Sequence, residues 1–253
     1  MSNKIQRSFS KSANRYDRFS SMHRGIADGL LASLVKERTP SSILDVGCGT
    51  GYLTGKLKES FPKARIIGLD FAQGMLDVAR AKHEGINWVL ADGAHLPFAD
   101  RIFDVVVSIL AYQWSGDLSS TFSEARRVLV HEGLMACTLF GFNSCQELFQ
   151  SLNEARKSRM QFKRLPNLPQ VREALSVSEF KKHEVMGENI EIEFKDMREL
   201  IVWLKMIGAN NLSRGEYLGQ ETINKAAAIY QENFSSRQGV RATFEVIRVY
   251  AKK

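Results

Sequence analysis

The sequence of 253 residues has only three cysteines and five prolines, and it contains no long uninterrupted apolar run. A membrane-spanning helix needs about 20 consecutive apolar residues, so we expect no membrane-spanning segment. Cys48, Cys137 and Cys145 are too few and too widely spaced for a disulfide framework or a Cys-x-x-Cys metal motif, and no metal site is predicted. Reduced thiols, and the lack of an apolar signal segment after Lys4 and Arg7, predict a cytoplasmic protein.

The positive charge of the chain is unevenly distributed. The formal net charge is +7, yet residues 1–40 hold eight Lys/Arg against three acids, and residues 156–172 hold six Lys/Arg and no acid. The rest of the chain is therefore net negative. Basic segments beside an acidic core favour an anionic partner. Aromatic residues do not interleave these segments as base-stacking platforms would, so nucleic acid is disfavoured as that partner.

The most informative motif is Ile-Leu-Asp-Val-Gly-Cys-Gly-Thr-Gly at residues 43–51. A short apolar strand runs into a turn with Gly47, Gly49 and Gly51, and a helical pattern begins at Tyr52. Glycines let a backbone pass close to a ligand. The N-terminus of the following helix offers unpaired N–H groups to a carboxylate or phosphate. The segment predicts a nucleotide-type cofactor site, and therefore an enzyme.

Two aspartates lie at predicted strand ends on either side of this turn. Asp45 precedes the glycines, and Asp70 closes the apolar run that begins at Arg65. In dinucleotide-binding folds, an acidic residue about 20 positions beyond the glycines binds the ribose hydroxyls. A turn or N-cap role is the alternative for either aspartate alone. The glycine spacing is G-x-G-x-G, tighter than the dinucleotide fingerprint G-x-G-x-x-G.

This tighter spacing resembles the first motif of the class I S-adenosylmethionine-dependent methyltransferases. Later motifs of that family follow in the same order: Phe71 and Met75 after Asp70, and then Asp92-Gly93 after a short apolar strand. Phe71 and Met75 are interpreted either as adenine neighbours or as ordinary core residues. The resemblance implies S-adenosylmethionine as the cofactor. The cofactor-binding residues that it implies are Asp45, Gly47, Gly49, Gly51, Asp70, Phe71, Met75, Asp92, Gly93 and Ser108.

Strands alternate with helices from residue 43 onward, which predicts an α/β fold with a doubly wound, mostly parallel sheet. The family resemblance implies seven strands. Ligands of such sheets bind at the carboxyl ends of the strands. The predicted strands are 43–46, 65–69, 87–90, 103–109, 133–140, 189–194 and an antiparallel edge strand at 242–250. The predicted helices after the N-terminal region are 52–60, 73–83, 119–129, 147–160, 176–183, 196–207 and 220–233.

Four segments are expected along the chain. They are an N-terminal helical cap at 1–40, a cofactor-binding core at 41–143, a helical lid insertion after the fifth strand at 144–175, and the completion of the domain at 176–253.

Both ends of the chain are similar to the malonyl-acyl-carrier-protein O-methyltransferases of biotin synthesis. The opening segment from Phe9 to Asp17 is similar to that family's F-x-x-x-A-x-x-Y-(D/E). Quinone and other small-molecule methyltransferases share the middle motifs but not these ends. The resemblance implies methylation of the free carboxylate of a malonyl thioester on an acidic acyl carrier protein. Further matching segments are Leu96-Pro-Phe98, Gln113-Trp114, Thr138-Leu139, Ser144, Glu147-Leu148, Leu204–Ala209 and Ala242–Val246.

A malonyl carboxylate is ionised near neutral pH, because ordinary carboxyl pKa values are about 4. No general base is needed, so no catalytic residue is assigned and the five histidines are interpreted as structural or surface groups. The carboxylate still needs orientation. We expect Tyr16 and one arginine among Arg156, Arg159 and Arg164 to supply it, since a guanidinium pairs with a carboxylate through two N–H bonds.

Three departures from the family pattern keep alternatives open. His23 replaces the usual glutamine, His131-Glu132-Gly133 replaces Pro-Gly-Gly, and residues 160–166 match the lid motif loosely. The alternatives are a methyltransferase of a quinone precursor or other small molecule, an RNA methyltransferase, and a non-catalytic S-adenosylmethionine-binding regulatory protein. The sequence does not distinguish a carrier protein from coenzyme A as the bearer of the thioester.

Overall fold

The computed structural model describes residues 3–37, 39–156, 165–207 and 218–253. Its helices are α1 (Asn3–Phe19), α2 (Ser21–Glu37), α3 (Tyr52–Ser60), α4 (Gln73–Lys82), α5 (Leu118–Val128), α6 (Gln146–Arg156), α7 (Leu168–Val177), α8 (Met197–Met206) and α9 (Gln220–Asn233). Its strands are β1 (Ser42–Val46), β2 (Arg65–Asp70), β3 (Asn87–Leu90), β4 (Phe103–Ile109), β5 (Leu129–Phe140), β6 (Lys182–Phe194) and β7 (Val240–Lys252). Within these ranges, no helix combines the length and the apolarity that a bilayer crossing requires.

The strands form one seven-stranded sheet in the order β3-β2-β1-β4-β5-β7-β6. Strands β1 to β5 pair in parallel, and β7 inserts antiparallel between β5 and β6. The predicted doubly wound α/β fold is therefore confirmed. The strand order reverses between β1 and β4, and the carboxyl ends at such a switch point are where ligands of this architecture bind.

Two element predictions at the C-terminal end were wrong. The expected helix at 176–183 does not form, because α7 ends at Val177 and β6 begins at Lys182. The expected edge strand β7 pairs on both sides, and β6 is the edge instead. Most residues of β6 are exposed and many are charged, which protects a sheet edge from pairing with other chains. The sequence predicted only the second half of this strand, at 189–194, because the charges interrupt the apolar alternation of its first half.

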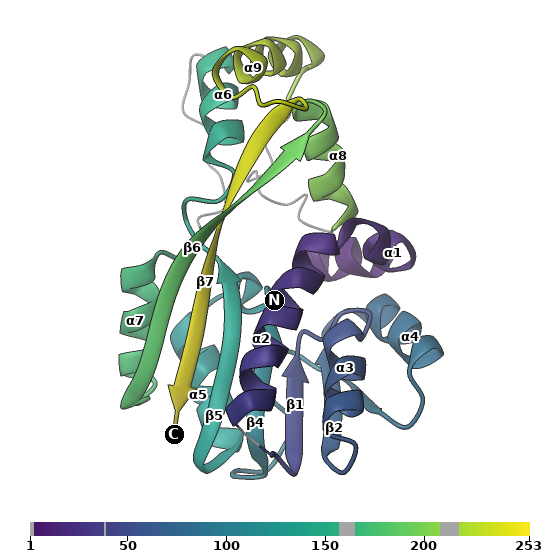
Figure 1. Cartoon of the computed structure of the whole chain (residues 1–253), viewed down its shortest axis with the longest axis vertical. Coiled ribbons are helices and arrows are strands. Elements are labelled where there is room, and N and C mark those ends of the chain that lie inside the picture. The colour runs from purple at the N-terminus through teal and green to yellow at the C-terminus, as the bar shows by residue number, and fades with distance from the viewer. Residues whose placement is uncertain (1–2, 38, 157–164, 208–217) are drawn as a thin grey trace.

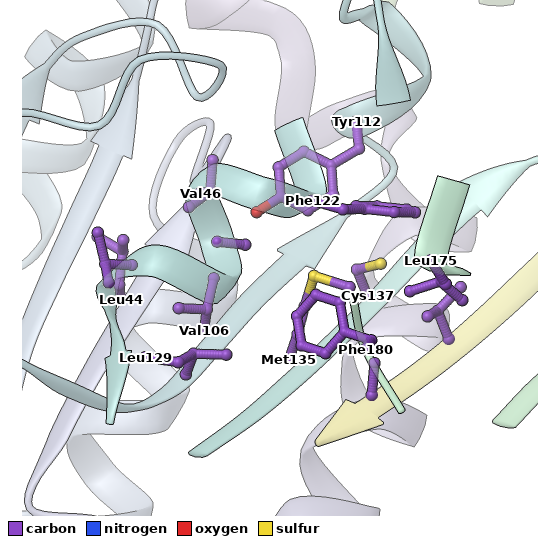
Figure 2. Close-up of a cluster of buried hydrophobic side chains, with 14 of the residues drawn as sticks. Leu44, Val46, Val106, Tyr112, Phe122, Leu129, Met135, Cys137, Leu175 and Phe180 are labelled. Carbon is purple, nitrogen blue, oxygen red and sulfur yellow. The ribbon is translucent and has the colours of Figure 1, made fainter. Parts of the chain in front are cut away.

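Helices cover both faces of the sheet (Figure 1). Apolar residues of α2 and α3 pack against one face of β1, β2, β4 and β5. Those of α5 and α7 pack against the other face, in a cluster that also contains Tyr112, Phe180, Met135 and Cys137 (Figure 2). Burial of these two layers fixes the carboxyl ends of β1, β2 and β4 relative to one another.

Strands β6 and β7 extend beyond the rest of the sheet and carry α6, α8 and α9, which we call the lid lobe (Figure 1). β5 pairs only with the part of β7 from Val246 onward, so the first half of β7 pairs with β6 alone. The lid lobe has its own apolar core. The expected lid at 144–175 contains α6, which packs on α9, and the first part of α7, which packs on α5 and β6.

Candidate functional site

The turn after β1 is held in a backbone conformation that favours glycine. Gly47, Gly49 and Gly51 have φ angles of 74°, 56° and 85°. The Gly47 N–H donates to the carbonyl oxygen of Leu69 at 2.7 Å, which fastens the turn to the end of β2. A Cβ at Gly47 would lie 2.2 Å from the Cβ of Ala111, so packing demands glycine there. A Cβ at Gly49 would meet no atom within 4 Å, so the space above Gly49 is open to a ligand.

Asp70 joins this turn to the start of α4. One of its carboxylate oxygens accepts a hydrogen bond from the Gly49 N–H at 2.9 Å, and the other accepts one from the Ala72 N–H at 2.8 Å. The side chain is buried, and this burial raises its pKa to about 6 although both hydrogen bonds oppose the shift. Each carboxylate oxygen retains another lone pair, so Asp70 can also accept hydroxyl groups of a ligand.

Asp45 lies at the end of β1 beneath the turn. Its carboxylate accepts a hydrogen bond from the Thr54 hydroxyl of α3 at 2.6 Å. Burial raises the pKa of Asp45 to about 7, against the opposing effect of Thr54. Two buried carboxyl groups with raised pKa values therefore lie next to the glycine turn, which suits a ligand that brings hydroxyl donors or positive charge.

These raised pKa values predict a pH effect on the free protein. Between about pH 4 and pH 7 the folded chain binds protons at Asp45 and Asp70 that the unfolded chain has released, so both groups make stability fall as pH rises through this range. Asp45→Asn keeps an acceptor for Thr54 and removes one of these ionisations. In thermal unfolding experiments, the stability of the variant relative to the wild type should increase as the pH is raised from 4 to 8. A gap between the two proteins that is independent of pH would contradict the assignment.

A cavity of about 60 Å³ lies between the turn, α1 and α2, and Tyr16, His23, Asp45 and Gly49 are among its lining residues. Burial, and after it the charges of Asp70 and Asp17, raise the pKa of Tyr16 above its ordinary value, so its phenol stays protonated. Burial lowers the pKa of His23 to about 4, so its imidazole is neutral at pH 7. The Nδ1 atom of His23 is buried with no hydrogen-bond partner among the described residues.

The ring of His23 connects this cavity to the lid lobe. It lies edge-on to Tyr16 and to Phe140, with ring centroids 5.8 Å apart in both cases, and 6.2 Å from Trp203 of α8. The indole N–H of Trp203 donates to the carbonyl oxygen of Phe19 at 2.9 Å. An aromatic wall therefore separates the glycine turn from the interior of the lid lobe.

Helix α1 covers the glycine turn and the start of α4. One carboxylate oxygen of Asp17 accepts a hydrogen bond from the Thr50 hydroxyl at 2.6 Å, and the other pairs with Lys82 of α4. The side-chain amide of Gln6 donates to the carbonyl oxygen of Phe71 at 2.6 Å. These contacts position Tyr16 above the turn.

Three further sequence-predicted residues, Met75, Phe71 and Asp92, lie in α4 or just after β2 and β3. Met75 is 1% exposed and packs with Ala13 of α1, so it occupies a core position. The Phe71 ring lies edge-on to Phe9 at 6.0 Å. The half-buried Asp92, which follows β3, accepts a hydrogen bond from the Ala94 N–H at 3.0 Å.

Three further predictions concern Gly93, Ser108 and the arginines. A Cβ at Gly93 would lie 2.7 Å from Val46, so glycine is required by close packing at the end of β1. Ser108 is fully buried near the end of β4, and its hydroxyl has no partner within the described part of the chain. Arg156 lies in the last turn of α6, whereas Arg159 and Arg164 lie outside the described residues.

Sequence reasoning did not assign roles to Asp17, Thr50 and Thr54. Asp17 closes the opening motif from Phe9, and its position one residue after Tyr16 was the available signal. The hydrogen bonds to Thr50 and Thr54 depend on how α1 and α3 pack, which no local pattern reveals.

The sequence of the chain is similar to those of known methyltransferases. Residues 44–137 match a family described as a methyltransferase domain. The chain is 34% identical to the malonyl-[acyl-carrier protein] O-methyltransferase of Geobacter sulfurreducens, with 99% of this chain and 98% of that protein covered. It is 36% identical to the enzyme of the same name from Hahella chejuensis, with 98% and 90% covered.

Solved structures show the same fold at lower identity. The YcgJ protein from Bacillus subtilis superposes with a TM-score of 0.65 at 17% identity, covering 90% of this chain and 98% of that chain. A possible histamine N-methyltransferase from Thermotoga maritima, described as S-adenosylmethionine-dependent, gives a TM-score of 0.59 at 16% identity, covering 98% and 99%.

Proposed function

We infer that this chain methylates the free carboxylate of a malonyl thioester on acyl carrier protein, a reaction of biotin precursor synthesis. The chain belongs to the malonyl-[acyl-carrier protein] O-methyltransferase family of class I S-adenosylmethionine-dependent methyltransferases. One observation carries the proposal: the similarity to the Geobacter sulfurreducens enzyme covers 99% of this chain and 98% of that protein. It therefore includes α1 and the lid lobe, which lie outside the methyltransferase motif at 44–137.

The residues around the glycine turn fit S-adenosylmethionine, which supplies an electrophilic methyl group on a sulfonium. The open space above Gly49 would admit the cofactor, and Asp70 would accept its ribose hydroxyls. Asp45 and Gly47 lie at the start of the same turn, where the amino-acid end would bind. The cavity of about 60 Å³ holds about two water molecules, so we infer that α1 moves outward when the cofactor enters.

The acceptor carboxylate would bind on the lid side of the turn. The Tyr16 phenol keeps its proton and can donate it in a hydrogen bond to an ionised malonyl carboxylate. The aromatic wall of His23, Phe140 and Trp203 would lie beside it and exclude water. Alignment and water exclusion then supply the rate enhancement, because the nucleophile is already ionised. One arginine among Arg156, Arg159 and Arg164 remains the proposed second anchor.

Tyr16→Phe should lower kcat on malonyl carrier protein by about 100-fold, because it removes one hydrogen bond to a charged group without changing the shape of the cavity. The Kd for S-adenosylmethionine should change little, since the ring and its packing on His23 remain. Steady-state kinetics and calorimetry measure the two quantities. Unchanged turnover would show that the phenol does not hold the acceptor.

One face of α1 is suited to an acidic carrier protein. Arg7, Lys11, Arg15 and Arg18 recur every three or four residues, so they lie on the same side of the helix. All four are exposed, and none is ion-paired with a carboxylate of the described residues. Tyr16 faces the site from the same helix. We infer that the acidic carrier docks along this stripe and delivers its malonyl group beside Tyr16.

The docking surface is tested by reversing its charge. Lys11→Glu with Arg15→Glu should raise KM for malonyl carrier protein at least about ten-fold at low salt, because the steering attraction becomes repulsion. KM for malonyl-CoA should be nearly unchanged. Lys36→Glu with Lys63→Glu makes the same charge change at exposed positions on other elements and is the control. If both double variants raise KM for malonyl carrier protein equally, the carrier is attracted by the overall charge of the protein and does not dock on this stripe.

The function itself is tested with purified protein and S-adenosylmethionine labelled in the methyl group. Malonyl carrier protein, malonyl-CoA, a quinone precursor and bulk RNA are offered separately at two salt concentrations. The proposal expects label on malonyl carrier protein, in an ester that mild base hydrolyses. Label on the quinone precursor or RNA would replace the proposed acceptor. Cofactor binding without transfer to any of them would favour the regulatory alternative.

A further inference from the structure

A second cavity lies at the opposite end of the sheet from the glycine turn. Its volume is about 780 Å³, within the range of small-molecule sites. Its wall is built from the end of α5, the segment before β4, the start of β5 and β6, and the last residues of β7. The glycine turn, by contrast, follows the carboxyl end of β1. The two cavities have no lining residue in common.

This cavity is lined by an excess of cationic side chains. The acidic lining residues are Asp100, Glu132 and Glu179. The basic ones are Arg101, Arg126, Arg127, His131, Lys181, Lys182, Lys252 and Lys253. Each acid already pairs with one of the cations: Asp100 with Arg127 at 2.7 Å, Glu179 with Arg126 at 3.2 Å, and Glu132 with Lys252. Arg101, Lys181 and Lys182 are not ion-paired with any of these acids, so the wall keeps an excess of positive charge.

Two groups show how closely these cations are crowded. The Lys253 ammonium donates to the carbonyl oxygens of Leu129 at 2.7 Å and Arg127 at 3.2 Å, which holds its charge at the cavity. Burial, and after it the positive charges of Arg101 and Arg126, lower the pKa of Lys253. The Nε of Arg126 is buried with no hydrogen-bond partner among the described residues, and a buried donor without an acceptor is costly.

We propose that this cavity binds a small polyanion of nucleotide size that carries several phosphate groups. Clustered positive charge with unused donors matches the chemistry of phosphate oxygens, which accept paired N–H bonds from guanidinium groups and ion pairs from ammonium groups. A concave space of this volume suits a small molecule better than a flat protein or duplex surface. The wall contains the start of β6 and the last residues of β7, at the end of these strands that lies away from the lid lobe (Figure 1).

Isothermal titration of the full chain tests this site with ATP, inorganic tripolyphosphate and citrate as probes, and needs no methyltransferase activity. The proposal expects both phosphate compounds to bind more tightly than citrate. Tighter binding of ATP than of tripolyphosphate identifies a nucleotide, and equal binding identifies the polyphosphate alone. Lys181→Ala with Lys182→Ala, and separately Arg101→Ala, should weaken binding at least about ten-fold.

The control is Lys36→Ala with Lys63→Ala, which removes two exposed lysines that do not line the cavity. It should leave the affinity within about two-fold of the wild type. Three outcomes would overturn the proposal: no measurable binding, citrate binding as tightly as the phosphates, or equal weakening in the cavity and control variants. Far-ultraviolet circular dichroism confirms that each variant is folded before the titrations are compared.

Discussion

Gly49→Ala is expected to lower the affinity for S-adenosylmethionine at least about 100-fold, which corresponds to about 2.7 kcal/mol. Gly49 has a φ of 56°, and its Cβ would point into space that no protein atom occupies within 4 Å. A methyl group there would stand where the backbone should meet the cofactor. The protein itself has room for it, so the expected damage is to binding rather than to packing. Calorimetric titration with S-adenosylmethionine measures the loss.

Gly85→Ala is the matched control for this experiment. Gly85 has a φ of 70°, its Cβ would also meet nothing within 4 Å, and it lies in the turn between α4 and β3. Both substitutions place alanine in the left-handed region, at a similar cost of about 1 kcal/mol in stability. The two variants should therefore unfold at similar temperatures, while only Gly49→Ala loses the cofactor. Equal cofactor affinity in both variants would remove Gly49 from the binding site.

Asp70→Ala should weaken cofactor binding about 100-fold or more. It removes the carboxylate proposed to hold the ribose hydroxyls, and it also removes the acceptor that holds the Gly49 N–H in place. The same substitution leaves the Ala72 N–H without its acceptor, so a stability loss of about 1–3 kcal/mol is expected as well. Affinity is measured by titration at a temperature where the variant is fully folded.

Asp104→Ala is the control that separates the loss of cofactor affinity from the loss of stability. Asp104 accepts hydrogen bonds from the Ser41 and Ser42 N–H groups at 2.8 and 2.9 Å, so its removal also frees two backbone donors. These donors lie at the amino end of β1, away from the glycine turn. Asp104→Ala should lose comparable stability and keep the wild-type Kd. If Asp70→Ala also keeps the wild-type Kd, the ribose assignment is wrong.

The sequence predicted the first half of the fold closely because strong local signals agree there. Apolar runs end at Asp45 and Asp70, and glycines separate the first run from α3, so β1, α3 and β2 start and end within about a residue or two of their expected positions. The sheet edge was predicted poorly. Only the second half of β6 was predicted, at 189–194, because the exposed, charged residues of the first half resemble loop or helix and form a strand by pairing with β7.

The site shows the same division between local and long-range information. Its carboxylates and glycines were predictable, because they lie within one contiguous motif and at the end of the next strand. A helical cap at 1–40 was expected, but the contacts that hold α1 over the turn were not, since those of Asp17 with Thr50 and Lys82 join residues far apart in the chain. The neutral state of His23 also depends on burial between Tyr16, Phe140 and Trp203, which come from three separate elements.

A crystal structure with bound S-adenosylhomocysteine tests the central claim most directly. The predicted result has the ribose hydroxyls on the Asp70 carboxylate, the backbone of the Gly47–Gly51 turn against the ligand, and the sulfur facing Tyr16. A ligand bound elsewhere, or one whose ribose contacts no carboxylate of β1 or β2, would contradict the account.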